Sequence, residues 1–300
     1  MVTSGQISVL LEPGIRTLTG KGLRLRDPEH SQFLSVATSQ KAKETNLELA
    51  GLPIAVERGE NDPIATFDPI VGSTKAHTMR SFAIGLEMSW ESVDDEQYGW
   101  LPTLSRQLGS SMREAREIHA ARVINKGFLT GGDVKGYDGL TLFSLVHPAL
   151  GQGATQANVF AGDISFGALQ TVITDFENRT DHQGLKMRVR PTKLFYAPAN
   201  DFLVQEILRS EKKPGGNLND VNTLQGRLQP VMLHYLDAAD IWFVKGDLGE
   251  EFDLRFYDRT PPSMMSFDDP RTRSSVFTLA SRYVAGADAW QNVYGGKTTP

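Results

Sequence analysis

A single segment, Pro102 to Asn125, restricts the folds open to this chain more than any other, because it reads as one uninterrupted helix. Pro102 suits the first turn of a helix, and Gly127 supplies a stop just beyond the last turn. Apolar residues recur every three or four positions and form one stripe, namely Leu101, Leu104, Leu108, Met112, Ala115 and Ile118. Such a helix is roughly 36 Å long, about the width of a small domain. The segment predicts a structural strut, although a core-lining helix of an ordinary enzyme would show the same pattern.

The composition narrows the class of protein further. With 300 residues, of which 40% are hydrophobic and 22% charged, the chain can build one large or two ordinary domains. Its formal charge of −5 argues against coating nucleic acid as its main task, because neutralising phosphates needs clustered Lys and Arg. The absence of cysteine excludes disulfides and zinc–thiolate sites and fits a reducing cytoplasm. No apolar run reaches membrane-spanning length, so we expect no membrane contact.

Residues 1–46 are polar and rich in glycine, with only short apolar runs. They predict an extended N-terminal arm rather than a compact core. Between Lys21 and Arg26 the basic residues alternate with leucines, as in a strand that carries its basic groups on one side. A solvated edge is favoured for this segment over a contact with nucleic acid.

Residues 47–90 contain two strand-like arms, LELAGLPIAVE and SFAIGLEMSW, joined by a long connection that contains several prolines and glycines. A connection this long without structure of its own is typical of a functional loop or an interaction arm. We interpret the segment as a projecting hairpin that packs on another surface, with a disordered insertion as the alternative. The side chains that such a surface would cover are Ile64, Phe67, Ile70 and Val71.

The rest of the chain mixes helices and strands, which predicts an α+β protein. A helix over Ile164–Asn178 has its apolar residues on one face and either Asp163 or Ser165 as its cap. A second helix, NDFLVQEILRSEK, opens at Asn200, and the polar loop Lys212–Gln225 follows it. The predicted strands are PTKLFYAPA, LQPVMLHYL, IWFVKG, FDLRFYD and SSVFTLASRYVAGADAW.

No motif predicts a chemical reaction. The six histidines lack the short spacings of metal sites, and no serine lies in a G-x-S-x-G turn. GGKTT near the C-terminus imitates the end of a phosphate-binding loop, but Gln291 stands where that motif needs its first glycine. We therefore predict no catalytic residue, no cofactor and no metal, and structural roles for His119 and His147.

Several segments together resemble the major head subunit family of Mu-like tailed bacteriophages. They are the helical segment followed by YDGLTLFSLVHP, the segment DHQGLKMRVRPTKLFYAPANDFLVQEIL, and LQPVMLHYLDAADIWFVKGD. The resemblance covers residues 82–290, and the residues before it match in layout only. Each piece is a weak signal, and their combination in this order is what makes the resemblance specific.

The resemblance implies the HK97-type capsid fold. Its parts would be an N-terminal arm at 1–46, an extended-loop hairpin at 47–90, a peripheral domain with the long spine helix at 91–163, an axial domain at 164–259, and a return to the peripheral domain at 260–300. The loop containing Lys212, Lys213, Pro214, Gly215 and Gly216 would point toward the symmetry axis of a capsomer. Relatives that fuse copies through a Lys–Asn isopeptide bond suggest Lys75 as a further contact residue, although no motif supports a cross-link.

The leading hypothesis is therefore a non-enzymatic major capsid protein. Its copies would form the hexamers and pentamers of an icosahedral shell around double-stranded DNA, in a virion assembled in the cytoplasm of a bacterial host. The expected partners are further copies, a portal protein, decoration proteins and, since the chain starts at Met1 without a cleaved segment, a separate scaffolding protein or none. An encapsulin-like compartment and a soluble enzyme of unknown reaction are the alternatives.

Overall fold

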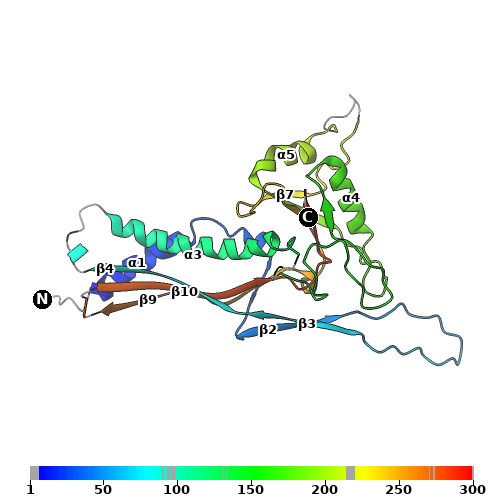
Figure 1. The fold of residues 1–300 in the computed structure, drawn as a ribbon, viewed down its shortest axis with the longest axis horizontal. Coiled ribbons are helices and arrows are strands. Elements are labelled where there is room, and N and C mark those ends of the chain that lie inside the picture. The colour runs from blue at the N-terminus through cyan, green and yellow to red at the C-terminus, as the bar shows by residue number, and fades with distance from the viewer. Residues whose placement is uncertain are drawn as a thin grey trace. The chain divides into compact units, whose positions relative to one another are not determined.

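The computed structural model describes residues 7–89, 91–92, 95, 99–130, 132, 134–213, 220–269, 271–272 and 274–298 (Figure 1). The chain forms two compact units, of which the first contains residues 1–44, 77–120 and 256–285 and the second contains residues 45–76, 121–255 and 286–300. Helices and strands both occur along the chain, so the predicted α+β class is confirmed. In the part of the chain that the structure describes, no helix is both long enough and apolar enough to cross a bilayer.

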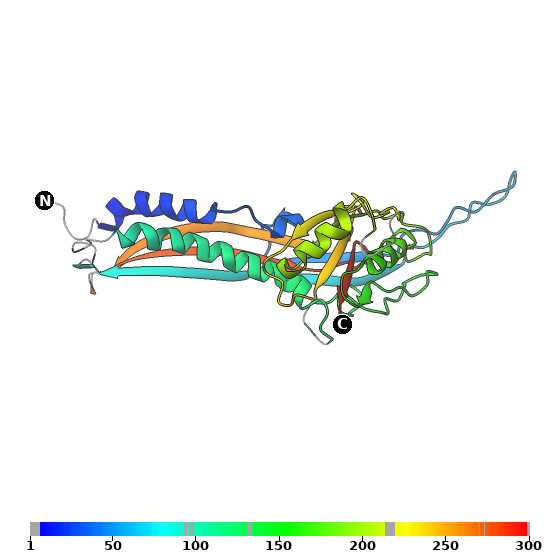
Figure 2. The same ribbon diagram turned by 90° about the horizontal axis from the view of Figure 1, so that it is seen from above.

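The first unit is a four-stranded sheet with two helices running along it (Figures 1 and 2). The strands lie in the order β1 (Ser35–Thr38), β9 (Arg255–Asp269), β10 (Ser274–Gly286) and β4 (Arg80–Ser89). The helices are α1 (Ile7–Leu23) and α3 (Trp100–Asn125), and a 3₁₀ turn, η2, spans His30–Gln32. β10 and β4 are antiparallel and stay in register from Ser274↔Ser89 to Tyr283↔Arg80. The apolar core of this unit lies between the helices and these two strands.

Helix α3 is the predicted strut, and it begins at Trp100 rather than at Pro102. In its first half the predicted stripe is confirmed, because Leu101, Leu108 and Met112 are buried and pack with residues of β4 and β10. Leu104 in the same stripe is half-buried.

In its second half the predicted stripe of α3 is wrong. Ala115 is only half-buried and Ile118 is 60% exposed, whereas Glu117 is buried at 4%. The Glu117 carboxylate accepts hydrogen bonds from the backbone N–H of His30 at 2.9 Å and from its ring Nδ1 at 2.7 Å. A polar anchor therefore sets which face of the helix is buried there, and apolar periodicity cannot reveal a polar anchor.

The expectation of an extended arm is wrong for residues 7–23, which form α1, and the basic segment from Lys21 is helix and turn rather than strand. α1 packs so closely on α3 that a Cβ atom on Gly22 would lie 2.1 Å from the carbonyl oxygen of Arg106. A Cβ atom on Gly109 would lie 2.1 Å from the carbonyl oxygen of Thr19. Glycines that weaken an isolated helix allow these two backbones to touch, and tertiary packing then stabilises the helix.

The second unit is built on a five-stranded sheet with helices α4 (Phe166–Glu177) and α5 (Asp201–Arg209). Its strands lie in the order β5 (Val159–Ala161), β11 (Val293–Lys297), β8 (Trp242–Gly246), β6 (Pro191–Tyr196) and β7 (Gln229–Met232). Short 3₁₀ turns span Pro198–Asn200 (η3) and Glu250–Phe252 (η4). Both helices and three of these strands agree with the sequence prediction, and Ser165 caps α4 by accepting the N–H of Ala168 at 3.1 Å.

Strand β11 lies in a different sheet from β10, the strand before it in the chain. β10 joins the sheet of the first unit, but β11 lies between β5 and β8 in the second. A Cβ atom on Gly296 would lie 2.1 Å from the Trp242 ring, and one on Gly295 would meet the ring of Phe143 at 2.6 Å. The two glycines of GGKTT therefore make room for aromatic side chains in a strand, and the division of the chain into named capsid domains stays a prediction.

Arg179 is a charged residue that is only 2% exposed, and no pattern in the sequence predicts its burial. Its guanidinium donates hydrogen bonds to the carbonyl oxygens of Gln291 and, at 3.1 Å, Val293, and it lies 4.3 Å from the ring centre of Phe176. Burial lowers the pKa of Arg179, an effect that nearby Tyr294 and Asp175 oppose. This one side chain ties the segment before β11 to helix α4.

Candidate functional site

The candidate site is the hairpin of β2 (Lys43–Leu49) and β3 (Val71–Thr78), which form a two-stranded sheet of their own. The pairing continues one step further, where the N–H of Ala50 donates to the carbonyl oxygen of Ile70 at 3.0 Å. Beyond this pair, residues 51–69 contain no strand. Figure 1 shows them as a long loop whose outgoing and returning segments meet at a tip.

The predicted second arm of this hairpin, SFAIGLEMSW, is wrong. Its residues from Ser81 to Ser89 lie in β4, which pairs with β10. The true second arm is VGSTKAHT, and only Met79 separates it from β4. Its many polar and small residues hide the strand from a reading based on apolar alternation.

The apolar side chains predicted to need another surface are indeed uncovered in the single chain. Ile64 is 73% exposed, Phe67 48%, Ile70 40% and Val71 56%. Lys75, the fifth predicted contact residue, lies within β3. That a neighbouring copy covers these side chains stays a prediction.

Sequence reasoning missed a second set of exposed apolar side chains, which we call the second apolar row. It lies on the segment that leads from β2 to the tip of the loop, the outgoing arm. Leu52, Ile54 and Val56 are 63%, 70% and 63% exposed. In an extended chain residues two apart point to the same side, so these three side chains form one apolar face. The alternating apolar residues in LPIAV could have indicated this face. They were interpreted instead as part of a paired strand.

The tip of the loop is polar and is closed by local hydrogen bonds. The N–H of Gly59 donates to the carboxylate of Asp62 at 3.2 Å, and the N–H of Asp62 donates to the carbonyl oxygen of Gly59 at 3.3 Å. Asn61 adopts a positive φ of 67°, which asparagine tolerates in turns. The loop thus has charged residues at its end and apolar residues along its arms.

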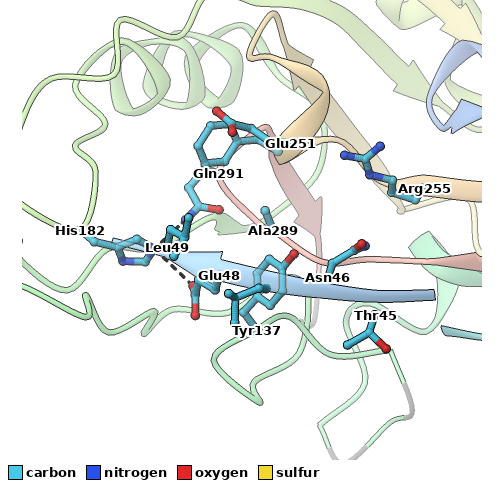
Figure 3. A pocket seen from close by; sticks show the side chains of 12 residues that line it. Thr45, Asn46, Glu48, Leu49, Tyr137, His182, Glu251, Arg255, Ala289 and Gln291 are labelled. Atoms are coloured by element: carbon cyan, nitrogen blue, oxygen red, sulfur yellow. Dashed lines mark hydrogen bonds and ion pairs between the residues drawn. The ribbon is translucent and has the colours of Figure 1, made fainter. Parts of the chain in front are cut away.

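The base of the hairpin is held by a contact between a carboxylate and a histidine ring, beside a cavity of about 340 Å³ (Figure 3). Glu48 on β2 points toward His182, and Oε1 of the carboxylate lies 3.2 Å from Nε2 of the ring. Nδ1 of His182 accepts the N–H of Leu150 at 3.3 Å. Gly72 on β3 packs against Glu48, since a Cβ atom there would meet Oε2 at 2.5 Å. The strands are therefore anchored, whereas the loop beyond them is not.

Tyr137, Arg255 and Gln291 also line this cavity, but its side chains do not form a recognisable reaction centre. Among the described residues, no three His, Asp or Glu side chains are grouped closely enough to hold a metal ion. Of the five residues named for the predicted axial loop, the structure describes Lys212, which bridges to Val221, and Lys213, whose Nζ lies 5.0 Å from the ring centre of Phe166. Pro214, Gly215 and Gly216 lie outside the described residues.

Comparison with known proteins identifies the family. A sequence profile described as phage capsid protein matches residues 72–296, three quarters of the chain. The chain belongs to this family. It is a structural subunit of a phage shell rather than an enzyme. No curated protein matches its sequence.

Solved capsids show the same fold. The capsid of a native GTA particle aligns with a TM-score of 0.60 at 12% identity, covering 92% of this chain and 91% of the other. The mature capsid of bacteriophage PhiM1 aligns with a TM-score of 0.59 at 12% identity, covering 88% and 84%. A virus-like particle from Pyrococcus furiosus aligns with a TM-score of 0.55 at 9% identity, covering 95% and 98%. The predicted HK97-type fold, that of tailed-phage major capsid proteins that form icosahedral shells, is confirmed.

Proposed function

We propose that this capsid protein is the major head subunit of a Mu-like tailed phage, and that its hexamers and pentamers close a shell around double-stranded DNA. The Mu-like assignment rests on YDGLTLFSLVHP and the segments that follow it in the same order. One structural observation carries the assembly mechanism: the hairpin loop exposes two apolar rows that its own chain does not cover.

The energetics favour cooperative assembly. Burying one Leu, Ile or Phe side chain stabilises a complex by up to about 1.5–3 kcal/mol. Ordering the loop opposes this gain, so the net stabilisation per copy is small. A closed shell repeats the contact in every copy and leaves no free edge, so many modest contacts act together.

The proposed partners follow from the task of such a shell. DNA must enter through one vertex, which requires a portal protein, and assembly to a defined size is served by scaffolding and decoration proteins. The chain is acidic overall, with a formal charge of −5, so it would line the shell without holding DNA tightly. Assembly would take place in the cytoplasm of the bacterial host, before the virion leaves the cell.

A shortened hairpin tests the proposal. Ala50 and Ile70 already pair, so replacing Gly51–Pro69 by an Asn-Gly turn keeps the β2–β3 ladder. The replacement removes five of the exposed apolar side chains and leaves Ile70 and Val71, and those removed are Leu52, Ile54, Val56, Ile64 and Phe67. We expect circular dichroism to show a normally folded subunit, because both cores are untouched, and electron microscopy to show no stable shells. Ordinary closed particles from this variant would contradict the proposed role of the loop.

Two full-length variants separate apolar contact from loop length. Replacing Leu52, Ile54 and Val56 by Ser should abolish shells. Replacing the acidic tip residues Glu57, Glu60 and Asp62 by Gln, Gln and Asn changes the same number of exposed loop residues and should leave assembly intact. Particles that form equally well from both variants would show that the outgoing arm does not hold the shell together.

A further inference from the structure

His147 is enclosed in the second unit, where it is 1% exposed. Both of its ring nitrogens face oxygen atoms. Nδ1 lies 2.5 Å from Oδ2 of Asp138, and Nε2 lies 3.0 Å from Oδ1 of Asn158. The backbone of His147 also pairs with that of Gln156 in both directions, which fixes the position of the ring.

The amide oxygen that faces Nε2 cannot be exchanged for a donor without breaking other hydrogen bonds. Oδ1 of Asn158 accepts the N–H of Ser144 at 2.8 Å, while its Nδ2 donates to the carbonyl oxygen of Leu142 at 2.7 Å. A flipped Asn158 amide would lose both bonds. Asp138 accepts the N–H of Leu140 with its other oxygen at 3.0 Å. A carboxyl group is in general a much stronger acid than an imidazolium, so we place the proton between Oδ2 and Nδ1 on the ring.

A neutral imidazole has one donor and one acceptor nitrogen. Opposite an ionised Asp138, either neutral tautomer would leave a lone pair of the ring facing an oxygen lone pair, in a site where water cannot intervene. We propose that His147 is a doubly protonated imidazolium in the folded protein, and that this buried cation holds together the segments of Asp138, Asn158 and Trp290.

The surroundings of the ring suit a positive charge. The Asp138 carboxylate is its counter-ion, and the Trp290 ring stacks on the imidazole at 4.3 Å with 9° between the planes. The other titratable groups near it are Asp181 and His182, which line the same small cavity, and Arg179, whose guanidinium lies 5.2 Å from the ring centre of Trp290.

His182 provides an internal contrast. Its Nδ1 accepts the N–H of Leu150, so its remaining proton lies on Nε2, the nitrogen that faces Glu48. The bonds of His182 are thus satisfied by a neutral ring, whereas those of His147 are not. Both rings pair with a carboxylate, so the difference between them lies in the second partner. It is an amide oxygen for His147 and a backbone N–H for His182.

The protonation state can be read without any substitution. Solid-state NMR of sedimented protein with ¹⁵N-labelled histidine and ¹³C-labelled tryptophan selects the ring stacked on Trp290, the one His–Trp ring contact among the described residues. At a pH where exposed His234 gives one bare and one protonated nitrogen, we expect two protonated nitrogens for the selected ring. A bare nitrogen signal from that ring would overturn the proposal.

A variant and its control add a second readout. In Asp138→Asn the new amide can donate to Nδ1, so a neutral ring with its proton on Nε2 becomes fully bonded. We expect a bare Nδ1 signal to appear in Asp138→Asn and to stay absent in Asp237→Asn, which removes a carboxylate from an exposed residue. Unchanged His147 signals in Asp138→Asn would contradict the assigned role of the carboxylate, and if this variant fails to fold, the wild-type spectrum still decides.

Discussion

At the scale of single residues, helix α3 is attached to its sheet by charged and aromatic side chains as much as by aliphatic ones. The His30 ring stacks on Phe256 at 4.6 Å while its Nδ1 bonds Glu117, and the guanidinium of Arg116 lies over the Tyr283 ring at 4.9 Å. Arg116 also pairs with Asp258 at 2.6 Å. Such networks fix one geometry, and they are sensitive to the loss of any member because the remaining polar group stays buried.

Glu117→Ala tests this sensitivity. Removing the carboxylate leaves the backbone N–H and the ring Nδ1 of His30 buried without an acceptor, so we expect a loss of about 1–3 kcal/mol for each in the free energy of unfolding. Gln107→Ala, on the exposed face of the same helix, is the matched control and should change stability by less than about 0.5 kcal/mol. Urea denaturation of the two purified variants measures both values, and similar losses would refute the anchor role of Glu117.

Buried tyrosines predict a loss of stability in alkali. Burial, reinforced by the hydrogen bond to Asp201, raises the pKa of Tyr196 to about 12, whereas an unfolded tyrosine titrates near 10. Between these values the unfolded state has lost a proton that the folded state retains, so the free energy of unfolding falls as pH rises from about 10 to 12. Tyr196→Phe should show a shallower decline over that interval in urea titrations. A decline as steep as that of the wild type would rule out Tyr196 as a contributor.

At the scale of elements, the close approach of α1 and α3 is the most sensitive packing in the first unit. Gly22→Ala places a methyl group 2.1 Å from a backbone oxygen that cannot move aside, so we expect α1 to be displaced at a cost of about 1–3 kcal/mol. Gly20→Ala, in the same helix with nothing within 4 Å, should instead stabilise by about 0.5–1 kcal/mol.

Hydrogen exchange distinguishes the two glycine variants. The amides of α1 should lose protection in Gly22→Ala and keep it in Gly20→Ala, while those of α4 in the second unit serve as an internal reference. Equal protection of α1 in both variants would show that the two backbones can separate at no cost.

Helices and strands were predictable where the local sequence contains both the apolar pattern and the residues that start or end the element. Helix α4 has an apolar face and a serine cap at the residue just before it, and β6 and β8 are apolar strands bounded by turns. α1 was missed because its stability comes from a glycine contact with a distant helix, and β3 because its residues are polar. The exposed loop was predicted, but not its second apolar row or the Glu48–His182 anchor. Those depend on which strands pair, and a single strand does not specify its partner.

At the scale of the whole molecule, the uncovered loop predicts that the isolated chain is not the final state. We expect the native protein to be recovered as capsomers or megadalton shells rather than as a 33.1 kDa monomer. Size-exclusion chromatography with light scattering, at several concentrations and with neighbouring gene products present, measures this. A compact, stable monomer under every such condition would contradict the assembly model.

Strand β11 also bears on the order in which the molecule is made. It lies inside the five-stranded sheet, between β5 and β8, yet the ribosome synthesises it last of the five. Until it arrives, β5 has no neighbour in the sheet and the inner edge of β8 is unpaired. A nascent or prematurely terminated chain therefore cannot complete this unit. Because the missing strand leaves a core incomplete, we expect such chains to be degraded by proteases before they are incorporated into a growing particle.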